Sequence, residues 1–578
     1  MSESLDRLLA DRFDLYANYD EKEDTVSRTD RLNACIRKIG IPVILILLIM
    51  PACSKGKQDQ AQKPTVQAVT EPVSGDWLVR HLSSEPATLN PITATDAYES
   101  VINGYIYESL LDLDNDTLEL VPRLAERWEV SDDKLQFTFT LKDGLHWQDG
   151  KALTTEDILY TFDRVTDPLV DAPHLRSYYK DLKKVEVLDE KTVRFTYAYP
   201  YFKALDMIGG LSIIPKHIFG SAEGQEFNTH PVGRAPVGSG PFSFIRWETG
   251  TDIVLERYPD YWGEKHHMNR IVFKIITDNT VALQVLKKQE MDFMGFTPIQ
   301  WVRQTDSDRF NNSFDKLRYP SLGYSYVGWN LRKPMFKDKR VRRALAMLMD
   351  REAFVENLWY GLGRVVSGNF FIDTPEYDKS IEPLPFDPGA AAKLLEEAGW
   401  SDHDGDGIID REGTPFRFEF TYSSGSTTGE QLATILQESL KKVGIEMSIR
   451  QLEWALFTQL LDDRAFDAVT LGWRLPVLAD PYQVWHSSQA DKGSNFVGFV
   501  NEEADRIIVD ARSEFDREKR SEMYRRFHRI LHEEQPYTFL FSRDSLVALD
   551  KRFENVKVYP LGPDSREWYV PTEDQRYK

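Results

Sequence analysis

Cysteine is almost absent from this chain of 578 residues. Its two cysteines, Cys35 and Cys53, both lie in the first tenth of the sequence, and none follows Cys53. The body of the protein therefore has no disulfide framework, no catalytic thiol and no cysteine-ligated metal site.

Sequence signatures of common enzymes are also missing. The chain has no GxSxG, HExxH, P-loop or Cys-His pair, and His266 and His267 lie in a polar turn without a third ligand at metal-binding spacing. Its 92 acidic residues make carboxylate pairs too common to indicate a glycosidase. We expect a protein that is not an enzyme and requires no cofactor, with an extracytoplasmic hydrolase as the alternative.

Positive charge is in short supply. The 71 Lys and Arg residues leave a net charge of -21, and we see no basic cluster of the kind that neutralises phosphates, so we expect no nucleic acid partner. Aromatic residues are plentiful by contrast, with 13 Trp and 25 Tyr, which suits a protein that encloses a ligand but also fills cores. A chain of this length should contain two or more domains.

The N-terminal region contains an apolar run from Ile39 to Met50, preceded by a basic pair and followed by Cys53. This is the order of a secretory signal, and the run is shorter than the roughly 20 residues of a membrane-spanning helix. It resembles a bacterial lipoprotein signal, although Met50 and Pro51 depart from the usual residues. We predict a signal region at 1–53, lipidation of Cys53, and a flexible tether at 54–75 that holds the protein to a membrane. An uncleaved signal anchor is the alternative.

Residues 1–30 are polar and acidic, whereas the start of a signal should be short and positive. We therefore hypothesise that translation starts nearer to Val26 or Leu32.

From Trp77 onward short strands and helices alternate, which predicts an α/β fold. Strands are expected at 128–130, 135–141 and 145–147, followed by a helix at 156–164 that begins with the capping pair Thr154 and Asp157. Further helices are expected over 336–349, and from Asp387 to Gly399.

Several of these blocks together are similar to the family 5 extracellular solute-binding proteins, the dipeptide- and oligopeptide-binding components of ABC importers. They occur in the family's order and cover the chain from residue 77 to its end. The blocks are LAERWEVSDDKLQFTFTLKDGLHWQDGKALTTEDILYTFDRV (124–165), PVGSGPFSFIRWE (236–248), RYPDYWG (257–263), YVGWNLRKPMFKDKRVRRALAMLMDRE (326–352), DPGAAAKLLEEAGW (387–400) and SNFVGFVNEEADRIIVDAR (494–512).

This resemblance implies a two-lobed periplasmic-binding-protein-like α/β fold of the large type II class, with a hinge between the lobes. We expect lobe I at 75–278 plus 545–578 and lobe II at 279–544, with the chain crossing near 276–278 and 541–544. The implied function is the capture of a peptide or similar small solute by lobe closure and its delivery to an ABC permease. We expect a monomer in the cell envelope. A ligand sensor or adaptor on the same fold is the alternative.

The stretch from Gly472 to Ser487 carries the strongest signal for a ligand site, because aromatic rings and an Arg are interleaved with prolines. Related peptide binders place an amine-binding Asp shortly after the Trp that Trp473 matches. Here no acidic residue precedes Asp480, which puts recognition of a free peptide N-terminus in doubt. The candidate ligand-binding residues are Trp473, Arg474, Asp480, Tyr482 and Trp485, with Trp329, Asn330, Asn90 and Tyr98 from elsewhere in the chain.

Residues 402–413 have the spacing of a calcium loop. Asp402, Asp404, Asp406 and Asp410 occupy positions 1, 3, 5 and 9, with Gly407 at position 6. Position 7 is Ile408, position 8 is Ile409, and position 12, which should supply a bidentate Glu, is a glycine. We predict a structural calcium site formed by Asp402, Asp404, Asp406, Ile408 and Asp410, with a metal-free turn as the alternative.

Overall fold

The computed structural model describes residues 72–176 and 178–577. The predicted signal region, Cys53 and the tether up to residue 71 lie outside the described residues. No helix in the described part of the chain is long and apolar enough to cross a membrane. The described chain joins the fold where the backbone N–H of Gly75 donates to the carbonyl of His267 at 2.9 Å.

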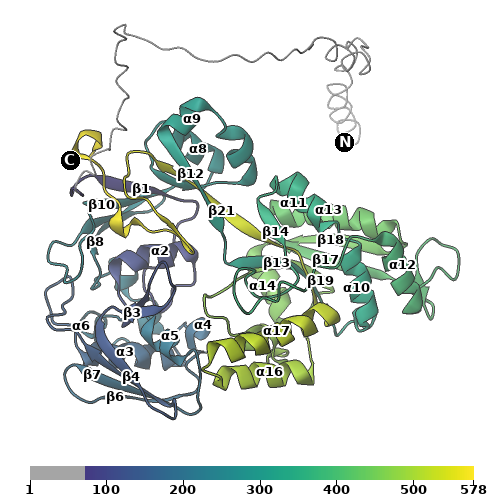
Figure 1. The fold of residues 1–578 in the computed structure, drawn as a ribbon, viewed down its shortest axis with the longest axis horizontal. Coiled ribbons are helices and arrows are strands. Elements are labelled where there is room, and N and C mark those ends of the chain that lie inside the picture. The colour runs from purple at the N-terminus through teal and green to yellow at the C-terminus, as the bar shows by residue number, and fades with distance from the viewer. Residues whose placement is uncertain (1–71, 177, 578) are drawn as a thin grey trace, which may run out of the picture. The chain divides into compact units, whose positions relative to one another are not determined.

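The larger of the two main sheets has the order β12-β21-β11-β1-β10-β9-β8 (Figure 1). Parallel pairing of β1 with β10 places the start of the described chain at its centre. Helix α8 (Asn279–Lys287) contacts β11, and helix α9 (Asp308–Ser313) contacts β12. Its strands are β12 (Phe314–Pro320), β21 (Phe541–Asp550), β11 (Phe293–Gly295), β1 (Trp77–Leu82), β10 (Arg270–Ile275), β9 (Asp252–Arg257) and β8 (Phe242–Glu248).

A four-stranded antiparallel sheet with the order β4-β5-β7-β6 follows in sequence, and α3 (Thr155–Thr166) packs on it. The Asp157 carboxylate accepts from the backbone N–H of Thr154 at 2.9 Å, so the predicted capping pair begins this helix. The expected strand at 145–147 is reduced to one bridge between His146 and Ala152. The strands are β4 (Ala125–Val130), β5 (Gln136–Leu141), β6 (Leu182–Val187) and β7 (Thr192–Tyr197).

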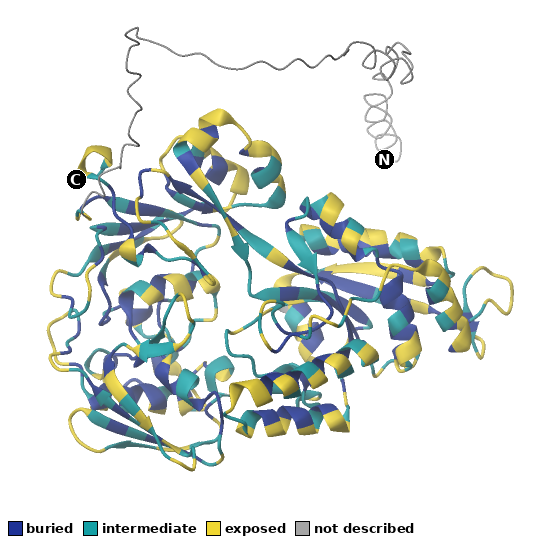
Figure 2. Cartoon of the chain, viewed as in Figure 1, coloured by how far each residue is buried: buried dark blue, intermediate teal, exposed yellow. Residues whose placement is uncertain are grey.

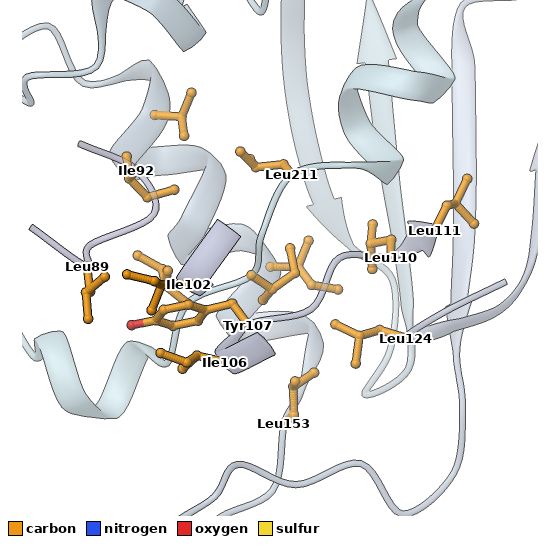
Figure 3. Close-up of a cluster of buried hydrophobic side chains, with 14 of the residues drawn as sticks. Leu89, Ile92, Ile102, Ile106, Tyr107, Leu110, Leu111, Leu124, Leu153 and Leu211 are labelled. Carbon is orange, nitrogen blue, oxygen red and sulfur yellow. The ribbon is translucent and has the colours of Figure 1, made fainter. Parts of the chain in front are cut away.

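Helix α2 (Ala97–Ile106) connects these two sheets through a shared apolar core (Figure 3). Ile102 and Ile106 stand one turn apart on the helix, and both are fully buried against side chains such as Leu89 and Leu110. Ser100, Val101 and Gly104 on another face of the helix are exposed. The orientation of α2 is therefore fixed by its apolar face, and the other face is left open.

The second main sheet has the order β18-β17-β19-β13-β20 and is covered by helices whose outer faces are exposed (Figure 2). Asp387 caps the predicted helix at α12, where its carboxylate accepts from Ala390 N–H at 2.9 Å. The strands are β13 (Gly323–Trp329), β17 (Arg417–Ser423), β18 (Glu446–Leu452), β19 (Ala468–Arg474) and β20 (Tyr537–Phe539). The helices are α10 (Lys339–Met347), α11 (Arg351–Trp359), α12 (Pro388–Glu397), α13 (Thr427–Lys441), α14 (Trp454–Asp462), α16 (Glu502–Ser513) and α17 (Arg517–Glu534).

Shorter elements complete the fold. The short strands are β2 (Leu111–Leu113), β3 (Leu120–Pro122), β14 (Gly363–Val365), β15 (Asp410–Arg411), β16 (Thr414–Pro415), β22 (Val558–Tyr559) and β23 (Gly562–Pro563). The short helices are α4 (Pro173–Arg176), α5 (Ala204–Gly209), α6 (Lys216–Phe219), α7 (Gly224–Asn228) and α15 (Tyr482–Trp485).

Strand β21 runs between the two lobes. Its first residues pair with β14, and residues 544–550 pair with β12 of the larger sheet. The chain therefore passes between the lobes at 541–544, and at 320–323 between β12 and β13. The expected first crossing at 276–278 differs from this pairing, because β11 and β12 hydrogen-bond into the larger sheet. By strand pairing, residues 279–320 belong with the first lobe.

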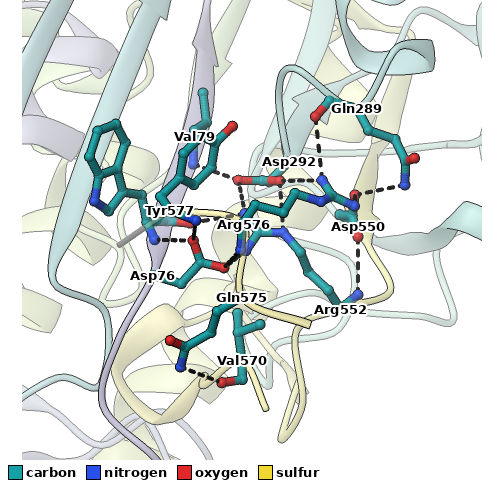
Figure 4. Close-up of polar contacts among 11 residues, drawn as sticks. Asp76, Val79, Gln289, Asp292, Asp550, Arg552, Val570, Gln575, Arg576 and Tyr577 are labelled. Carbon is teal, nitrogen blue, oxygen red and sulfur yellow. Dashed lines mark hydrogen bonds and ion pairs between the residues drawn. The ribbon is translucent and has the colours of Figure 1, made fainter. Parts of the chain in front are cut away.

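A buried ionic network joins the start of β1 to the C-terminal segment (Figure 4). Arg552 pairs with Asp76 and lies 2.7 Å from Asp292, and all three residues are buried. Arg576 lies 2.7 Å from Asp550. Because an uncompensated buried charge is costly, this network holds the N-terminal and C-terminal ends of the described chain together.

Candidate ligand-binding cleft

A cleft of 1140 Å³ lies between the larger sheet and the second lobe. Residues of β1, α2, β11 and β21 line one side, and the ends of α11 and α13 line the other. Its volume is slightly above the range of about 300 to 1,000 Å³ that is usual for small-molecule sites. Its Phe, Tyr and Trp residues are Tyr98, Phe273, Phe293, Phe296, Tyr319, Trp359 and Tyr360.

Arg543 is a cation of this cleft that has no anionic partner in the described parts of the chain. Its guanidinium lies 5.3 Å from the centre of the Trp359 ring. Among the residues that the structure describes, none forms a hydrogen bond or ion pair with this guanidinium. The neighbouring acid, Asp544, is occupied by Arg318 at 2.6 Å. Arg543 is therefore available to an anionic group of a ligand.

Arg80 is a second cation in the same cleft. Its guanidinium donates to the Tyr105 hydroxyl at 2.7 Å and lies 4.8 Å from the centre of the Phe293 ring. No carboxylate pairs with it within the described chain. The neighbouring His81 ring contacts the carbonyl of Ile276 at 2.8 Å, and burial lowers the pKa of His81. His81 is therefore neutral at pH 7, and Arg80 carries the charge at this position.

The N-terminus of α13 also faces the cleft, since Ser426, Thr427 and Thr428 line it. The Ser426 hydroxyl caps this helix by accepting from Gly429 N–H at 3.0 Å. The positive end of a 15-residue helix adds to the field of Arg80 and Arg543. The cleft thus favours an anionic ligand.

Of the predicted ligand-binding residues, Tyr98 lines the cleft, and its hydroxyl contacts that of Ser83. Four others do not line it, because they are buried at 2 % exposure or less. Trp485 packs against Phe499, Phe527, Tyr537 and Phe539, and Trp329 donates to Thr538 at 3.0 Å. Asn330 donates to the carbonyls of Arg464 and Phe466, while Asn90 accepts from Ile92 N–H. Their roles are structural.

Trp473 and Arg474 lie at the end of β19, so the stretch that we expected to be irregular begins as a strand. Trp473 is half-buried, stacks on Phe496 at 6.2 Å and approaches the Tyr537 hydroxyl at 3.5 Å. Arg474 is exposed and is not part of the cleft wall. Tyr319 is part of that wall, and the charge of Arg474 acts to lower the pKa of Tyr319. Burial outweighs that effect and raises the pKa of Tyr319.

Asp480 and Tyr482 lie in a contact between the two lobes, which we call the lobe contact. Asp480 accepts from the Tyr201 hydroxyl at 2.8 Å and pairs with Arg512 at 3.2 Å. The Arg512 guanidinium also lies 4.6 Å from the centre of the Tyr482 ring. Burial lowers the pKa of Arg512, but Asp480, Tyr201 and Asp181 together outweigh burial, so this pKa is raised.

Lobe I contributes two further groups to the lobe contact. The ammonium group of Lys203, which is 2 % exposed, donates to the carbonyl of Leu478 at 2.9 Å. The backbone N–H of Phe202 donates to the carbonyl of Arg512 at 2.9 Å. Asp480 therefore joins the lobes, and the ammonium group of Lys180 in lobe I lies 4.4 Å from the centre of the Tyr482 ring. Neither Asp480 nor Tyr482 lines the cleft.

The calcium loop gathers part of its predicted ligand set. Carboxylate oxygens of Asp402, Asp404 and Asp406 lie within 4.8 Å of one another, and all three residues are exposed. Asp410 lies apart from this group and accepts from the backbone N–H groups of His403 and Gly413. The Ile408 N–H donates to Asp406 at 2.7 Å. Calcium stays a prediction, and thermal unfolding in calcium against a chelator tests it.

Sequence reasoning missed Arg80 and Arg543. Arg80 lies within β1, and Arg543 lies near the start of β21 between Ser542 and Asp544. For Arg80, a cation next to the apolar residues Leu78 and Val79 was the available signal. The polar neighbours of Arg543 gave no such signal.

Comparisons with known proteins now bear on this cleft. The family described as "Bacterial extracellular solute-binding proteins, family 5 Middle" matches residues 119–495. Oligopeptide-binding protein AppA from Bacillus subtilis is 32 % identical over 551 residues, which cover 91 % of this chain and 97 % of that protein.

Solved structures show the same likeness. The structure of AppA from Bacillus subtilis in complex with a nonapeptide has a TM-score of 0.76 and 31 % identity, and the match covers 87 % of this chain and all of AppA. NikZ from Campylobacter jejuni in complex with Ni(L-His) has a TM-score of 0.73 at 25 % identity, over 86 % of this chain and 99 % of NikZ. This chain belongs to the family 5 bacterial extracellular solute-binding proteins.

Proposed function

We propose that the protein captures a peptide in the cleft between its lobes and delivers it to an ABC permease. The observation that carries this proposal is the large cleft, in whose wall Arg80 and Arg543 have no carboxylate partner among the described residues. A peptide offers a carboxylate to such cations, and its apolar side chains suit the aromatic wall. The likeness to AppA, whose solved structure contains a nonapeptide, supports the same class of ligand.

Capture would work through lobe closure. A ligand that touches both lobes binds the closed state better than the open state, and so increases the closed population. The lobe contact around Asp480 and Arg512 stabilises the closed arrangement without touching the ligand. The closed form is then the one that docks on the permease.

We place the protein in the cell envelope as a monomer, held to the membrane by a lipid on Cys53. The apolar run before Cys53 and the extracellular family support this location. Mass analysis of the mature N-terminus, with and without a signal peptidase II inhibitor, would test the lipid.

The ligand is tested by mass spectrometry of molecules that co-purify with the protein, followed by calorimetry with synthetic peptides of two to nine residues. We expect stoichiometric peptide binding that raises the unfolding temperature, without turnover. Failure of all these peptides to bind, together with a co-purified metal chelate, would favour a ligand of the NikZ kind. Because Asp544 beside Arg543 is paired with Arg318, Arg543 can meet an anionic chelate, which makes such a chelate the second candidate.

A further inference from the structure

A second cavity, which we call the side chamber, opens from the cleft into lobe I. It has a volume of 380 Å³ and shares Arg80, Val101 and Phe293 with the cleft wall. A further cavity of 260 Å³ continues from it and shares Arg123, His266 and Arg566 with it. The side chamber alone is within the size range of ligand sites.

The side chamber is open along one face of α2. Ser100 and Gly104 line it, and a Cβ atom at Gly104 would meet nothing within 4 Å. The opposite face of the same helix is fixed by Ile102 and Ile106, which are fully buried. The opening is therefore built into a rigid element.

Most charges of the side chamber are already paired. Arg566 lies 2.8 Å from Asp112 and 2.7 Å from Asp564. Arg123 lies 2.7 Å from the buried Glu108. Arg80, at the entrance, is left with the Tyr105 hydroxyl alone as a hydrogen-bond partner among the described residues.

Neutral polar groups lead from Arg80 into the side chamber. The Tyr105 hydroxyl contacts the Ser565 hydroxyl at 2.8 Å, which extends a chain of polar groups from Arg80 into the side chamber. His266 is 5 % exposed and lines both cavities, and its ring has no hydrogen-bond partner in the described parts of the chain. Burial lowers the pKa of His266 to about 4, so the ring is a neutral donor or acceptor at pH 7.

We propose that a longer peptide extends from the cleft into the side chamber and places a carboxylate beside Arg80. This inference rests on the proposed function, since it names the length and charge of the peptide. The carboxylate comes from the peptide C-terminus or from an acidic side chain. Guanidinium and hydroxyl donors recognise both sources in the same way.

The first experiment blocks the side chamber. Gly104→Leu fills it from α2, and Gly104→Ala is the matched control. Leu and Ala both favour a helix more than Gly does, so both variants should retain the fold, which thermal unfolding checks.

Pools of random tripeptides and nonapeptides are incubated with each protein, and retained peptides are quantified by mass spectrometry. We expect Gly104→Leu to retain nonapeptides at least 10-fold less than Gly104→Ala, with tripeptides within about 2-fold. Equal nonapeptide retention would overturn the proposal. Ser100→Leu repeats the test should Gly104→Leu unfold.

The second experiment tests Arg80 with free and amidated nonapeptide pools. We expect the wild type to enrich free C-termini, or Asp and Glu at one position of the amidated pool, by about 10-fold. Arg80→Gln should abolish either the preference for free C-termini or the preference for Asp and Glu. Arg543→Gln should keep the preference that Arg80→Gln abolishes. A wild type without either preference, or an Arg80→Gln variant that keeps both, would overturn the role of Arg80.

The two levels of the proposal fail differently. If the wild type retains no peptide of either length, the proposed function is wrong. If it retains nonapeptides and Gly104→Leu retains them equally, peptide binding stands and the side chamber is excluded.

Discussion

The cleft and the lobe contact differ in how their charges are occupied. In the cleft, Arg543 and Arg80 have no carboxylate partner among the described residues. In the lobe contact, Asp480 is occupied by both Tyr201 and Arg512, and Lys203 by a backbone carbonyl. Both regions combine arginine with aromatic rings, so composition alone does not separate them.

The difference in how the charges are paired indicates which of the two regions binds a ligand. Arg543 is exposed and Arg80 is half-buried, and neither has a carboxylate partner among the described residues, so a ligand that enters the cleft can pair with them. Hydrogen bonds across a lobe boundary, such as the one from Tyr201 to Asp480, instead stabilise one arrangement of the protein itself. We therefore expect substitutions in the cleft to change which ligand binds, and substitutions in the lobe contact to change how well every ligand binds.

The largest effect is expected for Trp485→Ala, which tests whether this ring belongs to either region. Because Trp485 is 1 % exposed among four aromatic rings, its loss should reduce the free energy of unfolding by about 3 to 5 kcal/mol. Chemical denaturation measures this. Tyr482→Phe, which removes one hydroxyl from the same short helix, is the control and should unfold like the wild type. Normal stability with weakened ligand binding would return Trp485 to the ligand site.

Arg543→Gln should produce the next largest effect. Loss of a charge-assisted hydrogen bond is worth about 1.5 to 3 kcal/mol, which corresponds to a dissociation constant about 10 to 150 times higher for an anionic ligand. Stability should be unchanged, since the guanidinium holds no carboxylate of the described chain. Calorimetry with free and amidated peptides measures the loss. If the variant binds the free and the amidated peptides with the same affinities as the wild type does, Arg543 is not part of the site.

Asp480→Asn should weaken binding less, by about 10-fold, because it acts through the closed population. The substitution removes the charge that holds Arg512 and weakens the bond from Tyr201. Tyr201→Phe removes only the hydrogen bond from the Tyr201 hydroxyl to Asp480, and should cost about 1 kcal/mol, or roughly 5-fold in affinity. An Asp480→Asn variant with wild-type affinity would show that the lobe contact contributes nothing to closure.

Arg474→Ala should have the smallest effect, a change of less than about 2-fold in affinity. The sequence suggested Arg474 as a ligand group, whereas its side chain is exposed outside the cleft wall. Exposed substitutions of this kind usually change free energies by no more than about 0.5 kcal/mol. A 10-fold loss of affinity by calorimetry would mean that the cleft extends to the end of β19.

The sequence was sufficient for the family and the two-lobed fold, because ordered blocks such as 124–165 and 326–352 carry them together. It was less informative for the site. Trp329 and Trp485 stand in motifs that suggest recognition, but three-dimensional packing buries both. Arg80 and Arg543 lie 463 positions apart in different strands, and only the pairing of β1, β11 and β21 brings them to one cleft.

Lobe boundaries were similarly hidden from the sequence. Strands β11 and β12 follow the hinge segment that the resemblance suggests, yet their hydrogen bonds run to β1 and β21. Long-range strand pairing of this kind is set by sheet register, which local patterns do not specify.

The most direct test of the difference between the two regions is calorimetry of Asp480→Asn and Arg543→Gln across one panel of peptides that vary in length and charge. If Asp480 acts only on closure, its variant raises every dissociation constant by the same factor, since the closed fraction is a property of the protein. Arg543→Gln should raise the constants by factors that depend on the ligand's charge. Ligand-dependent factors for Asp480→Asn, with a uniform factor for Arg543→Gln, would contradict these assignments.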